Sequence, residues 1–263
     1  MEIGNKIYSS IMCGLLFKII IKHGVKFQFG STPGVGCQDD TFTINTLLHI
    51  RQNHNLPTWV AFADLVKAFG TSNHALLIAT LVKCGAPPRL CSAIKCMYDK
   101  SIVKLIFRKV DTSIEFKVGI KQGDSMALVL FLFLMMTFSE TLEDQWMAFE
   151  LSKYQFVCKD NSLRSTGQLV IQQPGTLLSG ILFELFYMLY VDDSIFFKSR
   201  TTLEKGITLL SDHFSRFGLE MHIGTGKNLS KTECVFFPPP IFFNTRTIPL
   251  TSITTFTLSV QNK

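Results

Sequence analysis

The order of apolar patterns along the chain is the feature that most constrains its fold. Strand-like apolar segments alternate with segments in which apolar residues recur every three or four positions, as on one face of a helix. The predicted elements, in order, are the strand Trp59–Asp64, a helix ending at Gly85, a helix beginning at Pro87-Pro88, the hairpin Ile102–Phe107 and Ser113–Val118, the helix Met126–Phe138, the strands Leu182–Tyr190 and Ser194–Lys198, the helix Thr201–Phe217 and the strand Thr232–Phe237. Helices alternating with antiparallel hairpins predict an α+β fold, with one sheet and helices packed on one of its faces.

Composition supports a folded chain with a large core. Of 263 residues, 47% are apolar and 17% are charged, against a usual charged fraction of about 25%. These values exclude disordered, collagen-like and coiled-coil chains. The 24 phenylalanines require a deep core or a partner surface. The net charge of +6 is compatible with a polyanionic partner but does not identify one.

Targeting signals are weak. The best apolar run, Met126–Phe138, is shorter than the roughly 20 residues that cross a bilayer, so we expect a buried helix and no membrane partner. The apolar N-terminal stretch is interrupted by Lys18 and carries Glu2 where a signal peptide is positive. The seven cysteines show neither C-x-x-C nor zinc-site spacing. We therefore expect an intracellular protein, nuclear or cytoplasmic, and not a secreted one.

Acidic residues stand at the ends of apolar strands. Asp64 ends one such strand, and Asp192-Asp193 lie between two others. A carboxylate there is unfavourable unless it is paired, hydrogen-bonded or bound to a cation. Two Mg²⁺ ions about 3.5–4 Å apart would satisfy such a set and could stabilise a phosphoryl transfer. The alternative is structural: Asp192-Asp193 form a plain hairpin turn, and Asp64 caps a helix.

Five segments, taken in order, resemble the conserved boxes of reverse transcriptases. They are Gln28-Phe29-Gly30 with Gly36–Asp39 (Q-F-G…G-x-x-D), Asp64–Phe69 (D-x-x-x-A-F), Gly119–Asp124 (G-[VI]-[RK]-Q-G-D), Tyr190–Asp193 (Y-x-D-D), and Gly218–Met221 with Ser230–Glu233 (G-L-x-M…S-K-T-E). Each box alone is weak evidence, but the five occur in the family's order over residues 28–237. The subtype resembles the non-LTR (LINE-type) retrotransposon group.

The resemblance implies a polymerase palm, an antiparallel sheet with helices on one face, and a partial fingers subdomain. Residues 1–57 would be partial fingers, and residues 58–237 would be the palm with an inserted loop at about 152–180. Residues 238–263 would be an irregular tail. The thumb is expected to be absent, so the chain is expected to be a truncated transposable-element polymerase that lacks its thumb or its full-length polyprotein context.

The resemblance also implies a reaction and its metal ligands. Asp64 and Asp192 would bind two Mg²⁺ ions, with Mn²⁺ as a substitute, and Asp193 would assist. The reaction would be nucleotidyl transfer, in which a DNA primer 3′-hydroxyl on an RNA template attacks the α-phosphate of a dNTP. Catalysis of this kind depends mainly on positioning and electrostatics.

Four further residues receive nucleotide-binding roles from the resemblance. Phe69 would lie under the incoming sugar and exclude a 2′-hydroxyl, and Gln122 and Gly123 would line the nucleotide and template pocket. Lys231 would lie near the triphosphate as a charge stabiliser or proton donor. The structural alternatives are a core aromatic at Phe69, a turn at Gln122-Gly123 and a solvated lysine at Lys231.

The sequence departs from the family pattern at two places. Gly70 stands where the family usually has Asp after A-F, and Ser125–Leu128 replace the usual P-L-S-P. Two other functions therefore stay open. One is a catalytically dead retroelement remnant with at most weak nucleic-acid binding. The other is a different palm-type nucleotidyltransferase, such as a nucleotide cyclase.

Overall fold

The computed structural model describes residues 3–23, 27–99, 101–107, 110–121, 123–148, 154–158, 169–171, 181–185, 187–191, 193–198, 200–224, 230–239 and 255–256. The chain forms two compact units that interleave along the sequence. Unit 1 comprises residues 1–26, 65–143 and 211–220, and unit 2 comprises residues 27–64, 144–210 and 221–263. Helices combined with antiparallel sheets confirm the α+β prediction. The division into fingers and palm stays a prediction.

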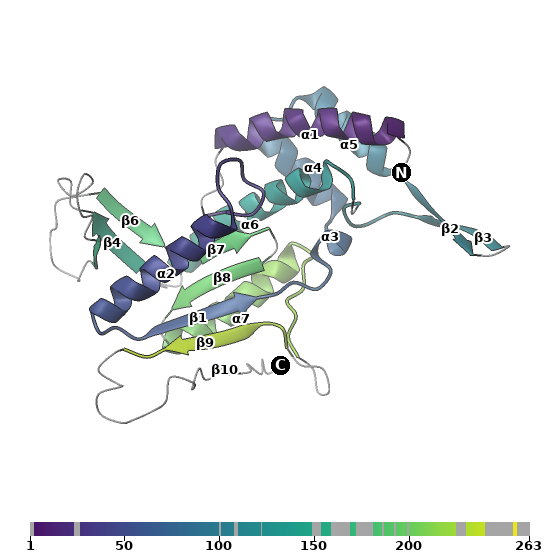
Figure 1. The fold of residues 1–263 in the computed structure, drawn as a ribbon. Coiled ribbons are helices and arrows are strands. Elements are labelled where there is room, and N and C mark those ends of the chain that lie inside the picture. The colour runs from purple at the N-terminus through teal and green to yellow at the C-terminus, as the bar shows by residue number, and fades with distance from the viewer. Residues whose placement is uncertain are drawn as a thin grey trace. The chain divides into compact units, whose positions relative to one another are not determined.

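A five-stranded antiparallel sheet forms the centre of unit 2 (Figure 1). Its strand order is β10 (Thr255–Phe256), β9 (Glu233–Phe237), β1 (Thr58–Ala63), β8 (Asp193–Lys198) and β7 (Tyr187–Tyr190). The apolar sequence of β1 suits this place, because its side chains Val60, Ala61 and Ala63 are buried. In register, Val60 lies opposite Phe197 of β8 and Val235 of β9.

One helix, α2 (Cys37–Asn53), packs against this sheet in unit 2. Leu47 of α2, Val60 of β1 and Met188 of β7 form a buried cluster. Partly buried apolar side chains surround the cluster: Phe27, Phe29, Ile44, Leu48, Ile50 and Phe237. The packing joins segments that are far apart in the sequence.

The predicted strand Leu182–Tyr190 is in fact two strands that belong to different sheets. β6 (Ile181–Leu185) pairs with β4 (Tyr154–Cys158), which also pairs with β5 (Leu169–Ile171). β7 pairs instead with β8. The segment expected as an inserted loop at about 152–180 contains β4, which was not predicted, and β5, so it contributes two of the three strands of a small sheet.

Unit 1 is mainly helical, and its core lies around α6 (Ala127–Ala148). The other elements are α1 (Ile3–His23), α3 (Ala68–Thr71), α4 (His74–Lys83), α5 (Pro88–Asp99), the hairpin β2 (Ile102–Phe107) and β3 (Val110–Glu115), and the end of α7 (Arg200–Arg216). Leu130, Phe131 and Phe133 of α6 are completely buried. The prediction of a buried apolar helix at Met126–Phe138 is therefore confirmed.

Helix α1 is apolar on two sides. Met12, Leu16 and Ile20 are buried, whereas Ile7 and Ile11 are each 59% exposed. Among the described residues, α1 alone has the length and composition of a membrane-crossing helix, properties shared by signal sequences and some core helices.

A buried histidine joins α6 to α7 within unit 1. Nε2 of His213 lies 3.1 Å from the carbonyl oxygen of Phe138 and 3.0 Å from Oγ1 of Thr141. Its Nδ1 is buried and has no hydrogen-bond partner among the described residues. Burial lowers the pKa of the imidazole and outweighs the hydrogen bond to Phe138, which raises it, and the nearby charge of Arg216 lowers it further. The fold therefore favours neutral His213.

We predict that acid destabilises the fold through His213. An unfolded histidine has a pKa of about 6.5, so below that pH the unfolded chain binds a proton that folded His213 disfavours. The unfolding free energy should fall as the pH drops below this value, until the lowered folded pKa is reached. Urea titrations across this range measure the slope.

The non-titrating variant His213→Gln should flatten this slope, because glutamine keeps an N–H for the Phe138 carbonyl and takes up no proton. His49→Gln, at an exposed position of α2, is the matched control for the loss of a histidine. An unchanged slope in His213→Gln would contradict the assignment.

Two adjacent aspartates in the first turn of α2 should affect stability in opposite directions. Asp39 Oδ2 accepts the Gly36 N–H at 2.8 Å. Asp40 is buried, and no described group forms a hydrogen bond with its Oδ1. Burial raises the pKa of Asp40, and it does so although a helix N-terminus favours negative charge. The stability that Asp40 contributes as a neutral acid is lost as the pH rises through its folded pKa.

Asp40→Asn should therefore raise the urea midpoint at pH 7, because it removes the buried charge. Asp39→Ala should lower the unfolding free energy by about 0.5–2 kcal/mol, the usual effect of losing a helix cap. Equal losses in both variants would show that Asp40 is stabilising as a charged group.

Candidate active site

The five-stranded sheet brings the predicted carboxylates to one of its ends. Asp64 directly follows β1, and Asp193 is the first residue of β8. Ala63 pairs with Ser194, so the same register, continued by one residue, places Asp64 across from Asp193. Asp192 lies outside the described residues, next to Asp193 in sequence. Neighbouring strand ends thus carry Asp64 and the turn that contains Asp193.

Lys231, a predicted site residue, lies next to Asp64. Its Nζ is 3.8 Å from Asp64 Oδ2, and the Asp64 side chain is 31% exposed. This long ion pair is open to solvent, so a substrate or an ion can reach the carboxylate. The structure therefore brings together Asp64, Lys231 and the backbone of Asp193.

Two residues that received no role from the sequence position this pair. His222 donates its backbone N–H to the Asp64 carbonyl at 2.8 Å, and its Nδ1 lies 3.2 Å from the backbone nitrogen of Lys231. The buried Thr232 places its hydroxyl 3.3 Å from the backbone nitrogen of Asp64. His222 directly follows the G-L-x-M segment and Thr232 belongs to the S-K-T-E segment, and these two segments were the available signal.

The Q-F-G segment lies beside the carboxylate turn in unit 2. Gln28 forms an isolated parallel bridge with Leu189, the residue before Tyr190 in β7. Its side chain is 2% exposed. In the sequence, Gln28 was noted only as part of the Q-F-G segment and was given no role.

The predicted nucleotide-binding residues Phe69 and Gly123 belong to unit 1. Phe69 in α3 stacks on Phe131 of α6 with 4.6 Å between ring centroids, as the core-aromatic alternative expected. Gly123 lies in a turn with φ of 83°, as the turn alternative expected. Gln122 lies outside the described residues. These observations define the position of the Phe69 ring and the backbone of Gly123. A nucleotide-binding role for either residue stays a prediction.

Gly70 and Gly119 lie close together in unit 1. A Cβ on Gly119 would come within 2.6 Å of the Gly70 carbonyl oxygen, so position 119 accepts no side chain without a backbone shift. A Cβ on Gly70 would meet only Lys67 Cβ at 3.7 Å, an ordinary contact. The departure from the family's Asp at position 70 is therefore not forced by crowding around its Cβ.

The described carboxylate of Asp64 is the kind of ligand that a hard divalent cation binds. Mg²⁺ prefers carboxylate oxygens, water and substrate phosphates, and Asp64 offers a partly exposed carboxylate. Within the described part of the chain, no three His, Cys, Asp or Glu side chains form a metal cluster. Asp192 lies outside that part, and only the backbone of Asp193 is described, so the ligand set stays a prediction.

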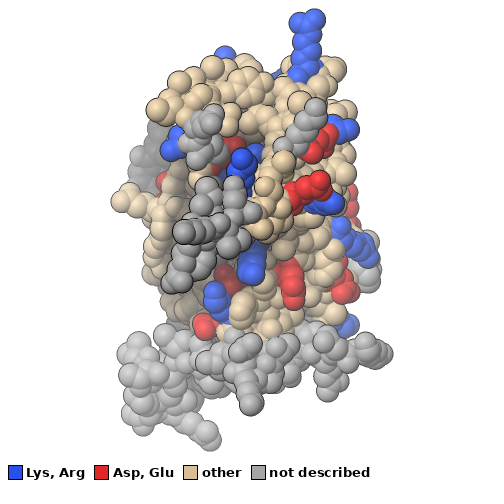
Figure 2. All heavy atoms as spheres, turned by 90° about the vertical axis from the view of Figure 1, so that its right-hand side faces the viewer, with Lys and Arg blue, Asp and Glu red and all other residues tan. Residues whose placement is uncertain are grey.

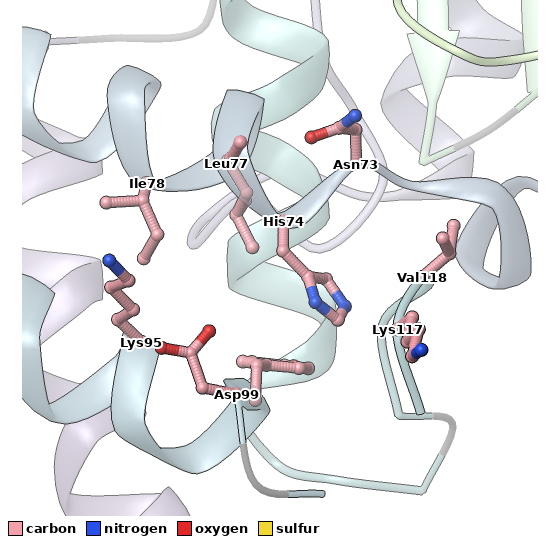
Figure 3. A pocket seen from close by; sticks show the side chains of 10 residues that line it. Asn73, His74, Leu77, Ile78, Lys95, Asp99, Lys117 and Val118 are labelled. Carbon is pink, nitrogen blue, oxygen red and sulfur yellow. The ribbon is translucent and has the colours of Figure 1, made fainter. Parts of the chain in front are cut away.

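A separate pocket of about 480 Å³ lies in unit 1 and contains none of the predicted site residues (Figure 3). Figure 3 shows His74 of α4 between Asp99 of α5 and Lys117, which follows β3. His74 Nε2 lies 2.6 Å from the Gly119 carbonyl oxygen. The histidine thus supports the segment that leads to Gly123.

Charge on the face shown in Figure 2 is mixed. Lysine and arginine side chains are interspersed with aspartate and glutamate on a mostly uncharged surface. The described lysine and arginine side chains on this face do not gather into a broad basic patch, in keeping with the modest net charge of +6.

Solved structures share the fold. Telomerase from Candida tropicalis in complex with a TWJ fragment of telomeric RNA matches with a TM-score of 0.55 at 13% identity, over 87% of this chain and 36% of that chain. Apo telomerase from Candida tropicalis matches with a TM-score of 0.56 at 13% identity, over 90% of this chain and 37% of that chain. This chain therefore spans little more than a third of those telomerase chains.

No curated protein matches the chain. Its sequence matches the family described as "Reverse transcriptase (RNA-dependent DNA polymerase)" over residues 2–235, which include both strand-end aspartate positions and the S-K-T-E segment. The chain belongs to the reverse transcriptase family.

Proposed function

We propose that this chain synthesises DNA on an RNA template by transferring nucleotides from dNTPs to the 3′-hydroxyl of a DNA primer. One observation carries the proposal: the β1–β8 register places Asp64 across from Asp193, with Lys231 Nζ 3.8 Å from the Asp64 carboxylate. Family membership supports the same reaction type.

The proposed ligands of two divalent ions are Asp64 and Asp192, with Asp193 assisting. Mg²⁺ bound there would neutralise phosphate charge and favour the ionised form of the primer hydroxyl. Asp64 is fixed for this task by its backbone bonds to His222 and Thr232. Lys231 supplies positive charge at the side of Asp64, where it would stabilise the pyrophosphate leaving group or donate a proton to it.

Phe69, Gln122 and Gly123 are proposed to contact the incoming nucleotide. The stacking of Phe69 on Phe131 gives the ring a fixed orientation, which a side chain needs if it is to discriminate against a 2′-hydroxyl. We further propose that the chain derives from a non-LTR retrotransposon. The Q-F-G and S-K-T-E segments, both of which support the carboxylate end of the sheet, favour this origin.

Removal of a proposed metal ligand should abolish synthesis. Asp64→Asn and Asp192→Asn should each lower primer extension on a primed RNA template by about 100-fold or more, because charge stabilisation at the reacting phosphate is lost. Purified chain, dNTPs and Mg²⁺ or Mn²⁺ suffice for the assay. Asp144→Asn, which removes an exposed aspartate of α6, is the matched control and should keep wild-type activity.

The same assay separates the competing functions. Wild-type chain that incorporates no dNTP with either metal would favour the catalytically dead remnant. Cyclic nucleotide formation from a free triphosphate, without primer extension, would favour the cyclase-type alternative. Activity that survives Asp192→Asn would show that the signal comes from a contaminant.

Lys231 should affect catalysis much more than stability. Lys231→Ala breaks an exposed ion pair, which contributes at most about 1 kcal/mol to the unfolding free energy. If Lys231 acts on the triphosphate, the rate of nucleotide addition should nevertheless fall by about 100-fold. Lys205→Ala removes another exposed lysine and is the control. Equal rates for both variants would assign Lys231 to the solvated surface.

A further inference from the structure

We propose that Gln28 is a positioning residue that fixes the backbone of Val191 in the turn that leads from β7 to β8, an inference that rests on the proposed function. Its Oε1 accepts the backbone N–H of Val191 at 2.9 Å and that of Gly30 at 3.0 Å. Its Nε2 donates to the Val191 carbonyl at 3.4 Å. One side-chain amide therefore binds both backbone polar groups of the residue before Asp192.

The backbone around Gln28 is itself anchored to β7. Leu189 donates its N–H to the Phe27 carbonyl at 2.8 Å, and Phe29 donates its N–H to the Leu189 carbonyl at 2.8 Å. The Phe27 ring packs edge-on against Tyr187, with 5.9 Å between centroids. These contacts set the position of Gln28 along the strand that leads into the turn.

The turn needs such a support because its backbone is unfavourable for its sequence. Val191 has a φ of 61°, in the left-handed region that a β-branched residue rarely adopts. Surrounding contacts must impose such a conformation. Gln28, which is 2% exposed, supplies both an acceptor and a donor to the half-buried Val191.

Gly30 allows the Q-F-G segment to approach the turn closely, because it has no side chain. A Cβ at position 30 would lie 2.5 Å from the Val191 nitrogen and 2.9 Å from the Tyr190 carbonyl carbon, both too close for any side chain. The absence of a side chain lets the Gln28–Gly30 backbone approach the turn closely enough for the amide of Gln28 to reach Val191. The Q-F-G segment thus has a physical role: Gln28 bonds the turn, and Gly30 makes room for it.

The function that follows is to orient the carboxylates without touching substrate. Val191 directly precedes Asp192, so a change in its φ redirects the chain that carries both aspartates. A residue of this kind should act on turnover rather than on substrate binding. Outer partners that orient a metal ligand typically change activity or metal affinity by 10- to 100-fold.

Gln28→Met, which matches the side-chain length but forms no strong hydrogen bonds, tests the inference. We expect kcat for primer extension to fall by about 10- to 100-fold, with the KM for dNTP nearly unchanged. Gln28→Glu keeps the acceptor for the Val191 and Gly30 N–H groups and should recover part of the lost kcat. Gln38→Met, at an exposed position of α2, is the matched control.

A second readout needs no activity. Amide hydrogen exchange of metal-free protein should show faster exchange at Val191 in Gln28→Met, by about tenfold or more, while the β1 strand keeps its protection and so reports an intact sheet. Gly30→Ala should have the same effect by a different route.

The outcomes separate the two proposals. Unchanged exchange at Val191 in Gln28→Met would overturn the positioning role, whether or not the wild type is active. Faster exchange with unchanged kcat would also overturn it, while leaving the polymerase proposal standing. If the wild-type chain makes no DNA but exchange at Val191 is faster in Gln28→Met, the contact of Gln28 with the turn is supported and the polymerase proposal is rejected.

Discussion

The antiparallel pairing of β1 with both β8 and β9 is the interaction on which the rest of unit 2 depends. Each partner strand contributes five residue pairs to β1, and this register alone decides which side chains meet at the sheet end. It places Asp64 across from Asp193 on one side and brings the chain before β9, with Lys231, back to Asp64 on the other. A one-residue slip would move every side chain of β1 to the opposite face, so the buried Val60 cluster also secures the geometry of the proposed site.

The helices and strands that could be predicted are those whose apolar pattern can be recognised within the element's own residues. The apolar run of β1, the buried α6 and the periodic apolar face of α7 are local signals. β1 and α7 lie close to their predicted bounds, whereas α6 continues past the predicted end at Phe138 to Ala148. The division between β6 and β7 carries no such signal, because the run is continuously apolar and only the choice of partner strand separates the two. β4 was missed for a related reason, since its pairing with β6 is visible only in three dimensions.

In the candidate site, too, individual residues could be named from the sequence, whereas the hydrogen bonds that connect them could not. Asp64 and Lys231 were named from motifs, and their proximity confirms that the two segments meet. The supporting roles of His222, Thr232 and Gln28 could not be derived, because their partners are backbone groups distant in the sequence. Conversely, Phe69 shows that a named residue can also have a structural contact: its ring stacks on Phe131 whether or not it discriminates between sugars.

The bond between Gln28 and Val191 has a consequence for how the chain matures. The two residues are separated by 163 positions, so at 5–20 residues per second a ribosome completes the second roughly 8–30 s after the first. Throughout that interval the Phe27–Gly30 segment has no β7 to pair with, and β1 lacks both of its neighbours. The turn can therefore take its final shape only after Val191 has been made, and until then the strand edges that pair with β7 and β8 are open.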